Sequence, residues 1–123
     1  MTLEELYAQI GGDYAEAIGR LRMEKLIDRF ILKFLDDPAS NALIESWAAG
    51  DDRAAFDAAH TVKGVCANLA LPRLAGPADK ITEALREGND ALRASTDIDA
   101  LIAEFTAEYK MTIEGIEAYK ASK

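Results

Sequence analysis

The sequence contains very little cysteine and histidine. Among its 123 residues there is one cysteine, Cys66, and one histidine, His60. A lone cysteine cannot form an internal disulfide, and these two residues are too few for a zinc site of the Cys/His type. An unpaired cysteine is also typical of a reducing compartment, so we expect a cytoplasmic protein. A disulfide scaffold and a structural zinc domain are excluded.

A basic surface and long apolar runs are absent as well. Fourteen lysines and arginines stand against 22 aspartates and glutamates, for a net charge of -8. Such a balance repels nucleic-acid phosphates and anionic lipid surfaces. No apolar run approaches the ~20 residues of a membrane-spanning helix, and the segment Met1–Glu5 does not resemble a signal peptide. We expect neither a nucleic-acid partner nor membrane association.

The sequence does contain enough apolar material for one core. Half of its residues, 50 %, are hydrophobic, and its length fits one domain at roughly 100–200 residues per domain. A fold of this size buries about 65–70 % of the surface of its unfolded chain, which is enough for stability without cross-links. We therefore expect a single domain over residues 1–123.

The hydrophobic pattern is helical throughout. Apolar residues recur at offsets of three, four and seven in every long segment, and none alternates with the period of a strand. Short connections favour antiparallel neighbours. The pattern predicts an all-α, up-and-down antiparallel four-helix bundle with short additional N-terminal helices. The four main helices are expected near residues 23–35, 51–69, 77–87 and 96–119.

Several helix ends can be predicted from local residue types. Thr2 and Asp13 are each followed three residues later by glutamate, the spacing of a capping box, and would begin two short N-terminal helices. Ser95 or Thr96 would begin the last helix. Pro77 interrupts the segment before it, which predicts either a late helix start at that proline or a kinked first turn.

The segment that holds the only histidine has a distinctive pattern. At about 100° per residue, His60 lies away from an apolar stripe that contains Ala55, Ala59, Val62, Cys66 and Leu69. Gly64, one turn later, costs ~1 kcal/mol in a helix interior but uncovers one side of the imidazole. Lys63 can bring an ammonium toward the same ring. Together these features indicate a surface nucleophile with an anionic product, for which phosphate is the obvious candidate.

The run from Ala58 to Leu69, AAHTVKGVCANL, resembles the signature of histidine-containing phosphotransfer (HPt) domains. The resemblance extends roughly from Tyr14 to Gly88. It implies a four-helix bundle that serves as a phosphorelay intermediate: His60 would accept a phosphoryl group from a receiver-domain aspartate and pass it to another receiver domain.

The resemblance also implies roles for single residues. His60 would be the phosphoacceptor, Lys63 its electrostatic partner, and Gly64 the clearance for the incoming acyl phosphate. Further residues are expected to contact the partner: Arg53, Asp57, Ala67 and Asn68. The partners would be response-regulator receiver domains, with a hybrid histidine kinase as a further candidate. We expect a monomer without a cofactor of its own, since magnesium would belong to the receiver.

The sequence departs from the HPt pattern at two places. The family commonly has a glycine after the leucine that ends the signature, whereas this chain has Ala70. Pro77 interrupts the following helix. Both departures concern the turn and the docking rim more than the nucleophile.

Other functions compete with phosphotransfer. A helical module could dock or sequester receiver domains or kinases without accepting phosphate, and a weaker alternative is the phosphoacceptor domain of a chemotaxis-type kinase. Lys63 could be an ordinary solvated cation, and Gly64 could serve close helix packing. The glycines match neither a Walker loop nor a dinucleotide fingerprint, so we expect no ATP-dependent enzyme activity. The set of His60, Lys63 and Gly64 favours phosphotransfer.

Overall fold

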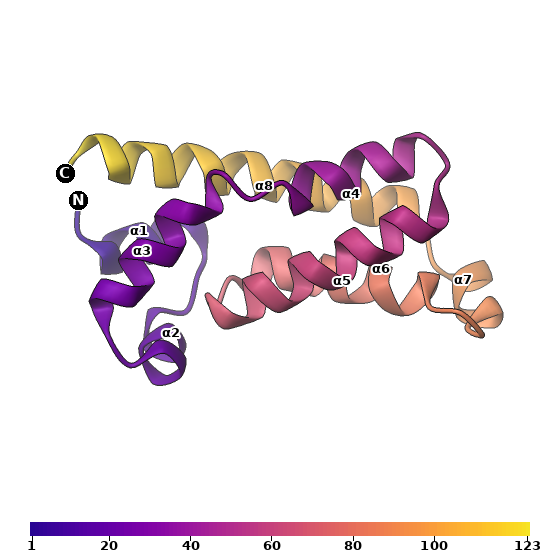
Figure 1. Ribbon diagram of the computed structural model, residues 1–123, viewed down its shortest axis with the longest axis horizontal. Helices are drawn as coiled ribbons and strands as arrows, with labels where there is room; N and C mark the ends of the chain where they lie inside the picture. The colour runs from indigo at the N-terminus through magenta and orange to yellow at the C-terminus, as the bar shows by residue number, and fades with distance from the viewer.

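The computed structural model describes all 123 residues and consists of eight helices without a strand. In Figure 1, α8 runs along most of the molecule, the first three helices gather at one end and α7 lies at the other. No helix is both long and apolar enough to cross a membrane. The helices are α1 (Leu3–Ile10), α2 (Tyr14–Leu21), α3 (Glu24–Phe34), α4 (Ala39–Ala48), α5 (Asp52–Asn68), α6 (Pro72–Leu85), α7 (Asp90–Ser95) and α8 (Ile98–Ala121).

The all-helical bundle expected from the sequence is confirmed. Helix α5 packs against both α4 and α6, and α6 packs in turn against α8. Helix α3, the first of the four expected long helices, instead packs mainly on α2 and α8. The helical path is interrupted between α3 and α4. Helix α3 ends at Phe34, Pro38 is the N-cap residue of α4, and the Asp37 carboxylate accepts a hydrogen bond of 2.8 Å from the Ala39 amide at the start of that helix. The short α4 therefore takes the place beside α5.

The two short N-terminal helices begin where the sequence predicts. The Thr2 hydroxyl accepts a hydrogen bond of 3.1 Å from the Glu5 amide, and the Glu5 carboxylate accepts one of 2.8 Å from the Thr2 amide. Asp13 caps α2 by accepting a hydrogen bond of 3.0 Å from the Glu16 amide. Each cap satisfies a backbone donor that the first turn of a helix leaves free.

The predicted late start at Pro77 is wrong. Helix α6 begins at Pro72, whose missing N–H is tolerated in the first helical turn, and it continues through Pro77. An interior proline removes one backbone hydrogen bond, but the Pro77 ring is buried, and that burial offsets part of the loss.

The predicted start of the last helix at Ser95 or Thr96 is also wrong. Those residues close α7 instead, and the Thr96 hydroxyl donates a hydrogen bond of 2.6 Å to the Leu92 carbonyl. Helix α8 begins at Ile98, because the Asp97 carboxylate accepts a hydrogen bond of 3.0 Å from the Ala100 amide.

The core fixes the helix that carries the histidine. Twenty-five buried hydrophobic residues form one contiguous cluster to which seven of the eight helices contribute. Tyr7 of α1 is fully buried, and its hydroxyl donates a hydrogen bond of 2.8 Å to the carbonyl of Leu69, at the end of α5. The C-terminal end of α5 is thereby tied to the N-terminal helices.

Candidate functional site

His60 lies on the exposed face of α5, as the helical pattern predicts. The opposite face is fully buried at Ala55, Ala59 and Cys66. Phe56, one turn before the histidine, stacks on its ring with 6.0 Å between centroids and 7° between planes. The imidazole is therefore supported on one side by an aromatic ring and open to solvent.

Gly64 leaves open space beside the histidine. A Cβ placed there would meet no atom within 4 Å outside its own helix backbone, whereas one at Gly115 would come within 2.6 Å of Ile10. Close helix packing therefore requires a glycine at position 115 but not at position 64. The alternative that Gly64 serves packing is wrong for this chain.

Lys63 points to α6 and is not a free surface cation. Its Nζ atom lies 3.2 Å from a carboxylate oxygen of Asp79 and 3.8 Å from one of Glu83. The lysine side chain is only 31 % exposed. The ammonium sits one turn after His60 along the helix, but carboxylates of the neighbouring helix hold it.

Glu83 is shared between two cations. Arg86 donates two hydrogen bonds to its carboxylate, at 3.1 and 3.2 Å. These bonds, with smaller contributions from the charges of Arg86, Lys63 and His60, hold the pKa of Glu83 below its usual value. The Arg86 guanidinium also lies 5.5 Å from the centroid of the Phe56 ring, a cation–π contact.

These contacts form a continuous set of side chains along the α5–α6 junction, which we call the charged flank: Phe56, Lys63, Asp79, Glu83 and Arg86. Of these residues, only Lys63 was predicted from the sequence. Asp79 and Glu83 lie one turn apart on one face of α6, and Arg86 follows directly after the helix as its extended C-cap residue. That spacing marks a polar face but does not indicate which helix the face meets.

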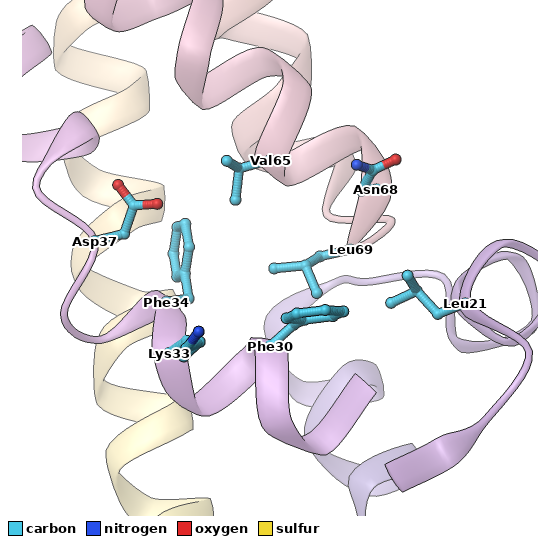
Figure 2. Close-up of a pocket in the computed structure, with 8 residues that line it drawn as sticks. All are labelled: Leu21, Phe30, Lys33, Phe34, Asp37, Val65, Asn68 and Leu69. Carbon is cyan, nitrogen blue, oxygen red and sulfur yellow. The ribbon is translucent and has the colours of Figure 1, made fainter. Parts of the chain in front are cut away.

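An apolar groove lies on the other side of α5, toward α2 and α3. It is a hollow of about 320 Å³. Figure 2 shows Val65 of α5 and Leu69, which directly follows that helix, directed toward Phe30 and Phe34 of α3 across the hollow, with Leu21 at the far side. Phe30 is 38 % exposed and is the one aromatic residue among the exposed large hydrophobic side chains of the chain. We call these five residues the apolar groove.

The four residues expected to contact a partner are not grouped in one place. Arg53 and Asp57 form an exposed ion pair of 3.8 Å on the turns of α5 before the histidine. Asn68 lies at the edge of the apolar groove. Ala67 is half-buried and lines a shallow hollow toward α2 and α6.

Cys66 belongs to the core of α5. It is fully buried, and burial raises the pKa of its thiol to about 12. Its burial confirms the position of Cys66 on the apolar stripe that the helical pattern predicts. No three His, Cys, Asp or Glu side chains come together in a way that could hold a metal ion.

Comparison with known protein families matches residues 22–110 to the Hpt domain. The chain belongs to the Hpt family. The match covers α3 to α7 and the first half of α8, and it includes His60, the charged flank and every residue of the apolar groove except Leu21. Hpt domains are four-helix bundles that carry out histidine phosphotransfer in phosphorelays and interact with receiver domains. Searches of the curated proteins and of the solved structures returned no match.

The Hpt domain of this chain has a strained turn after α5. Ala70 has a φ of 55°, in the left-handed region that glycine adopts most easily. This is the position at which the HPt resemblance predicts glycine. The Ala70 carbonyl accepts a hydrogen bond of 2.9 Å from the amide of Asp13, so the strained turn also contacts the start of α2.

Proposed function

We propose that this Hpt domain is a phosphorelay intermediate that accepts a phosphoryl group on His60 from a receiver-domain phospho-aspartate and passes it to another receiver. One observation supports this assignment most strongly. The only histidine of the chain is exposed on a helix whose opposite face is buried, next to open space at a glycine that the fold does not require for packing.

The transfer is a simple displacement at phosphorus. The lone pair of a neutral imidazole nitrogen of His60 forms the N–P bond, and the bond from phosphorus to the aspartyl oxygen breaks, with its electron pair left on the carboxylate. The positive charge of the ring is relieved by loss of the proton on the other nitrogen. Delivery to a second aspartate is the reverse reaction. Positioning and electrostatics supply most of the catalysis, because the transition state is loose.

The chain's own contribution is position and charge. The stacked Phe56 orients the imidazole, Gly64 admits the acyl phosphate, and Lys63 supplies a positive charge within one turn. We expect the receiver to bring the magnesium ion, so this chain needs no cofactor.

Receiver docking would cover the exposed face of α5. That face carries Arg53, Asp57 and Asn68, and Asn68 connects it to the apolar groove, where Phe30 offers apolar area for a partner to bury. We propose receiver domains as the partners of a cytoplasmic monomer, with a hybrid histidine kinase as a further candidate partner.

The test is label transfer to wild type and to His60→Gln. Wild type mixed with phosphorylated receiver domains should acquire an acid-labile label, because phosphohistidine is a phosphoramidate. His60→Gln should fold normally by circular dichroism, bind receivers and acquire none. An acid-stable label on the variant would contradict the assignment. A wild type that binds receivers without accepting label would be the non-transferring docking module.

A further inference from the structure

The ammonium nearest to His60 along the helix is held by two carboxylates of α6. We propose that Asp79, assisted by Glu83, is a positioning residue that tethers Lys63 away from the phosphoryl group and so shortens the life of phosphohistidine. The inference rests on the proposed function, since it concerns the phosphorylated form of His60.

The contacts distinguish the two carboxylates. Asp79 lies 3.2 Å from the Lys63 ammonium and has no other ion-pair partner in the chain. Glu83 lies 3.8 Å from that ammonium but also accepts both hydrogen bonds from Arg86. Glu83 is therefore committed mainly to the arginine, and Asp79 is the principal tether.

Phosphorylation would set up a competition for Lys63. A phosphoryl group on His60 adds close to two negative charges one turn from the lysine, against the single charge of each carboxylate. The carboxylates withhold the ammonium and also repel the phosphoryl group. Both effects disfavour the phosphorylated form, which suits an intermediate that must hand its phosphoryl group on.

The experiment measures the lifetime of the phosphorylated protein without any partner. Each variant is phosphorylated with phosphoramidate, a small phosphoryl donor, the donor is removed, and the phosphohistidine signal is followed by phosphorus NMR. The variants are Asp79→Asn, Glu83→Gln and, as a matched control, Glu87→Gln. The control removes one charge from an exposed residue just beyond α6 that has no ion-pair partner. Thermal unfolding checks that each variant is folded.

Asp79→Asn should lengthen the lifetime about two- to fivefold, which is the range that an exposed ion pair can contribute. Glu83→Gln should have a smaller effect, and Glu87→Gln none. In a Lys63→Ala background, Asp79→Asn should lengthen the lifetime by clearly less, because only the repulsion between Asp79 and the phosphoryl group is then removed. An unchanged lifetime in Asp79→Asn would overturn the tether, and so would an equal lengthening with and without the lysine, since repulsion alone would then explain it.

The two proposals fail in different ways. If phosphoramidate phosphorylates His60 but phosphorylated receivers do not, the relay function is wrong. The phosphohistidine lifetimes of the variants still test whether Asp79 tethers Lys63. If receivers deliver the phosphoryl group and Asp79→Asn decays at the wild-type rate, only the tether is wrong. If neither donor phosphorylates His60, both are wrong.

Discussion

The two groups of side chains on either side of α5, the charged flank and the apolar groove, differ in chemistry. Toward α6, the charged flank is a set of ion pairs and ring contacts around Lys63. Toward α3, the apolar groove is a hollow of about 320 Å³ with an exposed phenylalanine. His60 stacks on a member of the charged flank. The difference suggests that the charged flank interacts with the phosphoryl group and that the apolar groove binds the partner.

Substitution of Gly64, on the exposed face beside His60, should produce the largest change. Gly64→Gln places a long side chain one turn from His60, in space that is now open. Transfer from a phosphorylated receiver should fall by about tenfold or more, because a small displacement of reacting groups is costly. Phosphorylation by phosphoramidate should change little, and helix propensity should rise by up to ~1 kcal/mol. Receiver transfer at the wild-type rate would contradict the clearance role.

Removal of the charge on Lys63 should have a smaller effect. A free ammonium about 4 Å from a phosphoryl oxygen would contribute more, but the α6 carboxylates compete for it, so we expect about 1 kcal/mol to survive. Lys63→Ala should shorten the phosphohistidine lifetime or slow transfer about fivefold, and Lys63→Arg should retain part of the effect. Receiver binding, measured without phosphate, should be unchanged. Weakened binding with an unchanged lifetime would make Lys63 a docking residue.

Substitution in the apolar groove should weaken receiver binding and leave the phosphohistidine lifetime unchanged, which is the reverse of the result expected for Lys63→Ala. Phe30→Ser removes apolar area that a docked receiver would bury, at roughly 25 cal/mol per Å². The affinity for a receiver should fall about threefold to fivefold, while the phosphohistidine lifetime stays at the wild-type value. Met111→Ser on α8 is the control, because Met111 is an exposed apolar residue outside the groove. Equal loss of affinity in both variants would show that the groove is not the docking surface.

Several features whose signal lies within one helix were predicted correctly from the sequence. The exposure of His60, the open space at Gly64 and the caps at Thr2 and Asp13 all follow from helical period or from residues three or four apart. The role of His60 as phosphoacceptor stays a prediction.

Features formed between helices could not be predicted in the same way. The ion pair of Lys63 with Asp79 depends on how α6 is rotated against α5, and the period of either helix alone does not determine that rotation. The apolar groove likewise depends on where α3 packs relative to α5, which the turn between α3 and α4 allows to vary. The error at Pro77 has a different origin, because burial overrode the local preference against an interior proline.

The smallest expected effect is that of a substitution in the turn after α5. Ala70 is buried and follows Leu69 of the groove, and its φ of 55° costs a residue with a Cβ roughly 1–2 kcal/mol. Glycine would relieve that strain. Two effects of glycine would oppose this gain. The greater conformational entropy of the unfolded chain would lower the stability by ~0.5–1 kcal/mol, and loss of a buried methyl group would lower it by ~0.8 kcal/mol. Ala70→Gly alone should therefore leave the free energy of unfolding within about 1 kcal/mol of wild type.

A matched substitution isolates the strain. Ala67→Gly also removes a methyl group and frees the unfolded chain, but Ala67 lies in regular helix, where there is no positive φ to relieve. Urea unfolding should therefore find Ala70→Gly more stable than Ala67→Gly by about 1 kcal/mol. The phosphohistidine lifetime of Ala70→Gly should match wild type, since the substitution changes neither the charged flank nor the apolar groove. Equal destabilisation by the two substitutions would mean that the turn after α5 stores no strain, and that the alanine at this position fits the turn as well as the glycine expected there.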